Sequence, residues 1–344
     1  MFKLPACKYW LYLKRFIVLP FLFFSCSVIA QYKQHWQDVS SQYGPLPSSV
    51  QVFKTTSEVD GKPNIAFYLK AKLEDKKLHF TADTTFQRRL TPQQFYTKNG
   101  QPLVVVNTTF FSFATHQNLN TVVKWGKLVS YNVTSIKNRG KDTLTFTHPF
   151  GSAIGITKNR KADVAWLYTD SSEKMAYAMQ EPMDAFIDSV QMHSMKDMVK
   201  LSTYLVVGNH GFETQEVKNL KKWKVQTAVG GGPVLVQNGE IKITNNEERK
   251  FGGKAIDDKH PRTAMGYTAD GYLIILAVEG RNKGVAEGAS LTQLAQMLID
   301  IGCVEALNLD GGGSSCMLVN GKETIAPSDK AQRAVPAVFI IDSK

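Results

Sequence analysis

Short apolar runs separated by turns dominate the chain from residue 51 onward, and they constrain its fold more than any other feature. VQVFKT and IAFYLKAKL alternate partly between apolar and polar residues, and PLVVVN is an uncharged β-branched run typical of a strand buried on both faces. The pairs Asn238-Gly239 and Asp270-Gly271 and the segment TKNRK at 157–161 separate neighbouring runs, as hairpin turns do. We therefore predict a fold made mostly of β-sheet.

Three segments predict helices. TPQQFYTKNG has Thr91 as a cap and ends near Gly100, and SLTQLAQMLIDIG has Ser290 as a cap and Gly302 as its stop. In EPMDAFIDSVQMHSMKDMV the apolar residues fall near helical spacing, and the simplest role of its methionines is core packing. These apolar residues are Met183, Phe186, Ile187, Val190 and Val199. The expected class is α+β, a mostly β-sheet single catalytic domain over 51–344 with a few packed helices.

The first 30 residues differ from the rest of the chain. Four basic residues and no acidic ones precede FIVLPFLFFSCSVIA, which is too short for a comfortable membrane span and closes on small residues. We interpret residues 1–30 as a signal peptide cut after Ala30, followed by a polar lead-in over 31–50. The alternatives are an uncleaved anchor and a lipoprotein acylated at Cys26. The expected location is the periplasm, the cell surface or the medium, with membrane contact only through this segment or a lipid anchor.

The composition excludes several classes of partner. Loss of the signal lowers the formal charge from +11 to +7, and the remaining lysines are scattered without interleaved aromatic residues, so no nucleic-acid partner is expected. No CxxC or paired-histidine spacing supports a zinc site, and we expect neither a metal nor a cofactor. Cys303 and Cys316 remain after cleavage; a disulfide and two buried free thiols both fit.

Three apolar runs end on a polar residue beside a turn: Asn107 after VVV, Glu279 after YLIILAV and Asp310 after ALNL. A strand-end residue is held rigidly while its side chain reaches the edge of the sheet. Asn and Asp also end strands because they favour turns, and for Asn107 alone that explanation suffices. Glu279 and Asp310 are the stronger candidates for function.

Two triple-glycine runs follow or precede such strands. Gly311, Gly312 and Gly313 would let successive N–H groups converge on an anion, with Ser314 and Ser315 as further donors. Gly230, Gly231 and Gly232 form the second run, before Pro233. Neither run has the lysine of a P-loop or the GxGxxG spacing of a dinucleotide site. A nucleotide site of either kind is therefore disfavoured.

Arginines lie beside the same strands. They are Arg262 in HPRTAMG, Arg281 in VEGR and Arg333 in QRAVPAVFII. A guanidinium group can bind a phosphate through two hydrogen bonds. Each arginine alone would be a surface residue, but together they predict a shared anion site.

In order along the chain, NTTFFSF, GGGPVLVQNGE, HPRTAMGYTADGYLIILAVEGR, SLTQLAQMLIDIG, ALNLDGGGSSCM and RAVPAVFII resemble the phosphodiester glycosidase family over roughly residues 65–342. The resemblance implies a hydrolase that cleaves a sugar-1-phosphodiester at the anomeric carbon, on a carbohydrate such as an exopolysaccharide. Two departures stand out. Glu279 occupies a position more often Asp in the family, and the segment around 170–225 has no clear counterpart and is expected to shape the pocket.

The resemblance and the residues together give each candidate a role. Glu279 and Asp310 would activate water or act as nucleophile, the three arginines and the 311–315 loop would bind phosphate, and Asn107 and the 230–232 loop would hold sugar hydroxyls. His260 and His210 are expected to be structural. Two other readings stay open: a phosphodiesterase or phosphatase that cleaves P–O, and a non-catalytic glycan-binding surface protein.

Overall fold

The computed structural model describes residues 33–192, 194–198 and 220–343, so the predicted signal peptide and His210 lie outside the described residues. The residues from Lys33 onward form one compact unit, and the strands in its described ranges all pair antiparallel. Across the described ranges, no helix combines the length and apolarity needed to cross a membrane. The predicted α+β class with mostly β-sheet is confirmed.

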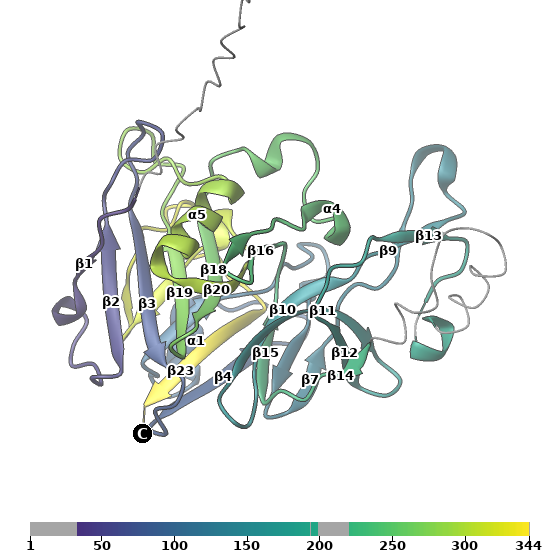
Figure 1. Ribbon diagram of the computed structural model, residues 1–344, viewed down its shortest axis with the longest axis horizontal. Helices are drawn as coiled ribbons and strands as arrows, with labels where there is room; N and C mark the ends of the chain where they lie inside the picture. The colour runs from purple at the N-terminus through teal and green to yellow at the C-terminus, as the bar shows by residue number, and fades with distance from the viewer. Residues whose placement is uncertain (1–32, 193, 199–219, 344) are drawn as a thin grey trace, which may run out of the picture. The chain divides into compact units, whose positions relative to one another are not determined.

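The largest sheet has eight strands, and α5 covers one of its faces (Figure 1). Ile274 and Leu276 face α5, while their neighbours Ile275 and Ala277 face the main core, so both faces are apolar. The order is β1 (Gln37–Asp38), β2 (Val50–Thr55), β3 (Ala66–Lys72), β19 (Tyr272–Val278), β18 (Arg262–Thr268), β20 (Cys303–Asn308), β16 (Val234–Gln237) and β17 (Glu240–Ile241).

Three further sheets complete the fold. The seven-stranded sheet has the order β14 (Lys221–Lys222), β12 (Met175–Met179), β11 (Ala162–Asp170), β10 (Gly151–Ile156), β15 (Thr227–Gly230), β6 (Val122–Lys124) and β7 (Lys127–Ser130). The five-stranded sheet has the order β22 (Lys322–Glu323), β21 (Met317–Val319), β5 (Val104–Asn107), β23 (Ala337–Ser343) and β4 (Leu78–Thr84). The smallest is β13 (Phe186–Asp188), β9 (Phe146–His148) and β8 (Ile136–Lys137). Leu69, Trp166 and Phe339 bring the three large sheets into one core.

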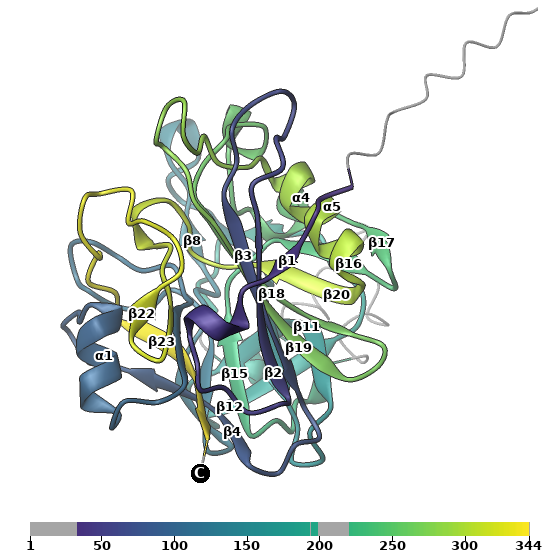
Figure 2. The ribbon, with the colours of Figure 1, turned by 90° about the vertical axis from the view of Figure 1, so that its left-hand side faces the viewer.

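Two of the predicted helices form with the expected caps. Helix α1 (Pro92–Lys98) begins at a capping box between Thr91 and Gln94, and packs against β5 and β21. Figure 2 shows α1 on the same side of the molecule as β22 and β23. Helix α5 (Leu291–Ile301) begins at the Ser290 box and ends at Gly302, whose φ is 98°. The short helical turns are α4 (Asn245–Glu248), η1 (Ser40–Gln42), η2 (Gly140–Asp142), η3 (Gly253–Ile256) and η4 (Gly312–Ser314).

The helix predicted from the methionine-rich segment is wrong over its first half. Residues 186–188 form β13, which pairs with β9, and Ile187 and Val190 are each 52% exposed. Pairing with β9 therefore determines the local structure, and the apolar spacing does not. The expectation that methionines fill the core is confirmed for Met183, Met192 and Met198, whereas Val199 lies outside the described residues.

All three predicted hairpins form: TKNRK joins β10 to β11, Asp270-Gly271 joins β18 to β19, and Asn238-Gly239 joins β16 to β17. Asn238 and Gly239 both have positive φ, as a tight hairpin turn requires. The predicted polar lead-in contributes the edge strand β1, and its Val39 and Tyr43 reach the main core. Cys303 and Cys316 are buried free thiols, as in the second alternative.

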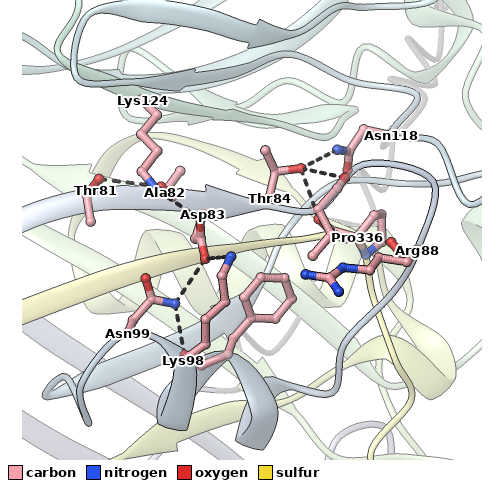
Figure 3. A network of polar contacts seen from close by, with 12 residues as sticks. Thr81, Ala82, Asp83, Thr84, Arg88, Lys98, Asn99, Asn118, Lys124 and Pro336 are labelled. Carbon is pink, nitrogen blue, oxygen red and sulfur yellow. Dashed lines mark hydrogen bonds and ion pairs between the residues drawn. The ribbon is translucent and has the colours of Figure 1, made fainter.

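A buried polar network ties the five-stranded sheet to its neighbours (Figure 3). Asp83 on β4 is 4% exposed and accepts hydrogen bonds from Lys98 at 2.6 Å, Lys124 at 2.8 Å and Asn99 at 3.0 Å. Burial opposes ionisation of Asp83, but the donors from Lys124, Lys98 and Asn99 outweigh it and lower its pKa. The network holds α1 and β6 against β4 by charge-assisted hydrogen bonds.

Candidate functional site

Three neighbouring strands bring predicted site residues to one edge of the eight-stranded sheet. Strand β18 lies between β19 and β20 and runs antiparallel to both, so Glu279 and Asp310 leave β19 and β20 at the same edge. Arg262 pairs with Val278 there, and Leu309 N–H donates to Thr263 O at 2.8 Å. One intervening strand separates the backbones of the two acids by about 10 Å.

The loop after Asp310 does not form the predicted cradle of free amides, because most of its N–H groups have partners within the protein. Gly312 N–H donates to Pro261 O at 2.8 Å, and the N–H groups of Ser314 and Ser315 donate to carbonyls within the loop, both at 3.2 Å. Gly311 N–H donates to the Asp310 carboxylate. The prediction that this backbone binds phosphate through several amides is therefore wrong.

The glycines instead let two guanidinium groups approach the loop closely. Gly312 has a φ of 60°, and a Cβ there would lie 2.9 Å from Arg281 Nη2. A Cβ at Gly313 would overlap Arg333 and Asp329. Arg333 Nε donates to Asp329 Oδ2 at 3.1 Å, and Arg281 Nη1 lies 4.0 Å from Asp329 Oδ1. The structure thus brings Arg281 and Arg333 together, with the carboxylate of Asp329 as their shared partner.

Asp310 lies beside this cationic cluster. Burial raises the pKa of Asp310 to about 7, against the opposing effects of a hydrogen bond with Ser314, the charge of Arg333 and the Gly311 N–H. Ser314 is 1% exposed and also lies 3.4 Å from Arg333 Nη1. A carboxyl group with a pKa near neutrality can exchange a proton with water, as a general base requires.

Arg262 lies at the same edge, but its guanidinium group is committed to the protein. It is 3% exposed and donates to the carbonyl oxygens of Ala289 at 2.9 Å and Asp258 at 2.9 Å. Burial lowers its pKa to about 10. The predicted phosphate-binding role of Arg262 is therefore corrected: it fixes two loops behind the site. His260 beside it has a lowered pKa, first through burial and then through Arg262 and Arg281, which fits its expected structural role.

Asn107 does not reach a substrate. Its side chain is fully buried, with Nδ2 donating to Asp310 O at 2.6 Å and Oδ1 accepting from Thr263 Oγ1 at 2.9 Å and Cys316 N at 3.0 Å. The predicted contact with sugar hydroxyls is wrong because the strand end is covered by the loop it positions. Asn107 fixes the backbone of Asp310.

The second glycine run is also buried rather than open to a sugar. The N–H groups of Gly230, Gly231 and Gly232 donate to the carbonyls of Thr121, Ser152 and Asn308. A Cβ at Gly231 would collide with Asn308 O, so the glycines allow β15 and β16 to pass close to β20. The predicted sugar-binding role of Gly230–Gly232 is therefore wrong.

Glu279 is 6% exposed, and its Oε2 accepts from Ala326 N at 2.9 Å. That contact attaches the strand end to the loop that carries Asp329 and leads to Arg333. The structure thus places Glu279 at the predicted edge, where it holds the segment that supplies part of the cationic cluster.

Sequence reasoning missed Asp329, Arg89 and Phe113. Phe113 is 62% exposed and lies between two guanidinium groups, 5.5 Å from that of Arg333 and 5.3 Å from that of Arg89. The spacing of Asp329 four residues before Arg333 was the available signal for the first, since such pairs favour contact when the chain turns. No local signal pointed to the other two, because they come from separate loops.

The sequence comparisons bear on this geometry. The phosphodiester glycosidase family profile matches residues 199–342. The chain is 34% identical over 106 residues to bovine N-acetylglucosamine-1-phosphodiester alpha-N-acetylglucosaminidase, covering 28% of this chain and 20% of that protein. It is 42% identical over 77 residues to the prophage-derived uncharacterized protein YomE of Bacillus subtilis, covering 22% of this chain and 12% of that protein. The matches thus span at most a fifth of these relatives.

Solved structures extend the likeness to the whole fold. The catalytic domain of the zebrafish N-acetylglucosamine-1-phosphodiester alpha-N-acetylglucosaminidase, auto-inhibited by its pro-peptide, has a TM-score of 0.56 at 19% identity, covering 91% of this chain and 89% of that one. A hypothetical protein from Synechocystis also has a TM-score of 0.56, at 16% identity, covering 86% of this chain and 62% of that one. The resemblance to the phosphodiester glycosidase family that the motifs show is confirmed: the family profile and the bovine relative match part of the chain, and the zebrafish structure shares the fold.

Proposed function

We propose that the chain is an exported hydrolase that cleaves a sugar-1-phosphodiester at the anomeric carbon, on a glycan or exopolysaccharide. The observation that carries the proposal is the position of Asp310, with its pKa of about 7, beside the arginine cluster on the glycine loop. The bovine relative is named for hydrolysis of N-acetylglucosamine from a 1-phosphodiester, which supports the same class of linkage here.

The residues divide the reaction between them. Asp310 accepts a proton from a water molecule as the water oxygen attacks the anomeric carbon. The bond from that carbon to the phosphate oxygen breaks, and the electron pair leaves with the phosphate. A phosphodiester is a good leaving group, so Arg281 and Arg333 can stabilise its charge without a second acid to protonate it.

Asp329 keeps the two arginines oriented before substrate arrives. Its contact with Arg333 is a close ion pair, whereas Arg281 is 4.0 Å away and has a 43% exposed side chain. Arg281 is therefore the guanidinium freer to turn toward a phosphate. Direct displacement of the phosphate by water, with Asp310 as the base, would invert the configuration at the anomeric carbon.

Hydrolysis of a glycosyl-1-phosphodiester in ¹⁸O-labelled water tests the proposal. Cleavage of C–O puts the label in the sugar, and proton NMR at early times should show the inverted anomer. Label in the phosphate product would instead identify a P–O-cleaving phosphodiesterase. Binding of glycosyl phosphates without turnover would identify a glycan-binding protein.

A further inference from the structure

A cavity of about 410 Å³ lies apart from the arginine cluster. Its walls come from the loop after β5, from the segment that runs from β7 to β8, from the start of β10 and from the segment after α4, all within the described residues. Its apolar walls include Phe110, Leu119, Val133, Ile136, Pro149 and Phe251. The volume suits one or two sugar rings, and aromatic faces are common platforms for them.

Most polar groups of this cavity are already occupied by the protein. Asn120 accepts from Phe110 N at 3.0 Å and donates to Gly231 O at 3.2 Å. Asn132 accepts from Thr121 N at 2.9 Å and donates to Gly151 O at 3.1 Å. These amides shape the walls and leave little hydrogen-bonding capacity for a ligand.

Glu248 is saturated in the same way. Its Oε2 accepts from Ser152 N at 3.2 Å and Ser152 Oγ at 2.8 Å. Its Oε1 accepts from Val234 N at 2.8 Å, Thr244 Oγ1 at 2.7 Å and Trp166 Nε1 at 3.3 Å. Glu248 is 2% exposed, and its carboxylate links β10, β16 and the start of α4. Because these protein donors occupy its oxygens, it has no free acceptor position for a ligand.

Among the polar groups of this cavity, Lys250 is not satisfied by a hydrogen bond within the described residues. No acceptor among the described residues lies within hydrogen-bond distance of its Nζ, which is 5.6 Å from the centre of the Phe110 ring. Burial lowers the pKa of Lys250, and the charge of Glu248 opposes that shift. Arg249, which is exposed and lines the same cavity, adds a second cation. A half-buried ammonium group beside apolar walls and without a hydrogen-bond acceptor favours a ligand that brings an anion.

Contacts within the protein link the cavity wall to the Asp310 loop. Asp310 N–H donates to Thr108 O at 2.8 Å, two residues before Phe110. The Phe251 ring lies 5.8 Å from that of Phe110 and 6.0 Å from the guanidinium of Arg262, which stands behind the glycine loop. These contacts connect the cavity wall to the loop that carries Asp310.

We propose that this cavity binds a carboxylate-bearing sugar ring of the substrate, and that Lys250 determines the preference for the acidic ring. The inference rests on the proposed function, because it names the class of glycan that the hydrolase takes. The ring stacks on Phe110 and Phe251, and its carboxylate accepts hydrogen bonds from Lys250 Nζ.

Titration calorimetry with methyl glucuronide, methyl glucoside and inorganic phosphate tests this, since none of these probes is a substrate for phosphodiester hydrolysis. The glucuronide should bind the parent at least tenfold more tightly than the glucoside, while phosphate reports on the separate arginine cluster. Lys250→Met should remove that preference, and Lys250→Arg should keep part of it. Lys254→Met, which changes an exposed lysine four residues further on, is the matched control and should bind like the parent.

Equal binding of the glucuronide and glucoside would overturn the proposal. So would undiminished glucuronide binding by Lys250→Met with a native melting curve. If Lys250→Met does not fold, Phe251→Leu serves instead and should weaken both sugars while leaving the phosphate result unchanged. Arg281→Met should abolish hydrolysis and keep glucuronide binding, which separates failure of this inference from failure of the proposed function.

Discussion

The two triple-glycine runs are alike in sequence and opposite in use. Gly230–Gly232 is buried between sheets, with its amides bonded to neighbouring backbone. Gly311–Gly313 lies at a strand edge, where its missing side chains make room for Arg281, Arg333 and Asp329. The comparison shows that a glycine run signals a close approach but not what approaches: backbone in one case and charged side chains in the other.

The largest effect on activity is expected at Asp310, because this proposed catalytic residue precedes the Gly311–Gly313 loop and has no counterpart at Gly230–Gly232. Asp310→Asn should lower kcat/KM by about a thousandfold, because it removes the proposed base. The parent's kcat/KM should rise with pH and level off above about 7, where the carboxyl is ionised. The measurement is initial rate against pH with a glycosyl-1-phosphodiester.

Asp310→Asn should lose activity but gain thermal stability at alkaline pH. A carboxyl whose folded pKa is raised loses its proton first in the unfolded chain, so the parent loses stability as pH rises from about 4 to about 7. Asp310→Asn should therefore melt at a higher temperature than the parent at pH 8 and not at pH 4. The exposed Asp142→Asn should change neither rate nor melting. Activity within a few-fold of the parent would remove Asp310 from the mechanism.

The buried loop should respond to substitution through stability. Gly232 has a φ of 110°, and a Cβ there would overlap Glu248 and Lys250. Gly232→Ala should lower the free energy of unfolding by about 3 kcal/mol through backbone strain and overpacking. Urea denaturation measures it, with Gly252→Ala as control, because a Cβ at Gly252 meets nothing within 4 Å. An unchanged midpoint would contradict the assignment of this loop to the scaffold.

The edge loop should respond through activity. Gly313→Ala should displace Arg333 and Asp329, whose side-chain ends can move at little cost to folding. We expect a loss of ten- to a hundredfold in kcat/KM, mostly through KM, with a shift in unfolding free energy below about 1 kcal/mol. The same Gly252→Ala control applies. If Gly313→Ala unfolds the protein while activity per folded molecule persists, the two loops share a scaffold role.

The Asp83 network gives a reference for a purely structural polar site. Its lowered pKa means that its stabilisation is present above about pH 4 and is lost as pH falls through the folded pKa. Asp83→Asn should cost about 2 kcal/mol of unfolding free energy at pH 7, from weakened charge-assisted hydrogen bonds, and less at acid pH. Denaturant titrations at pH 7 and pH 3.5 measure it. A loss of turnover in the folded variant would be unexpected.

The sequence predicted the elements whose signals are local. Thr91 and Ser290 cap their helices as expected, and the Asn238-Gly239 and Asp270-Gly271 turns join the strands that flank them. The methionine-rich helix failed because pairing between Phe186 and His148 is a contact across the chain, which apolar spacing cannot report.

The candidate site was predicted only in part, because some of its features depend on contacts between distant segments. The strand ends of Glu279 and Asp310 could be placed because apolar runs mark their strands. Whether a guanidinium is free depends on distant carbonyls, so Arg262 could not be distinguished from Arg281 in sequence. Lys250 gave no signal, because its isolation arises only when Glu248 is saturated by three separate segments.

Strand β23 has a consequence for how this fold can be assembled. It lies between β4 and β5, and Thr84 Oγ1 donates to Pro336 O across 252 positions of the chain. This interior strand of the sheet is therefore synthesised last, so β4 and β5 lack this pairing partner until the end of the chain has been made. A fragment that ends before Ala337 would leave the edges of β4 and β5 unpaired and open to association with other chains.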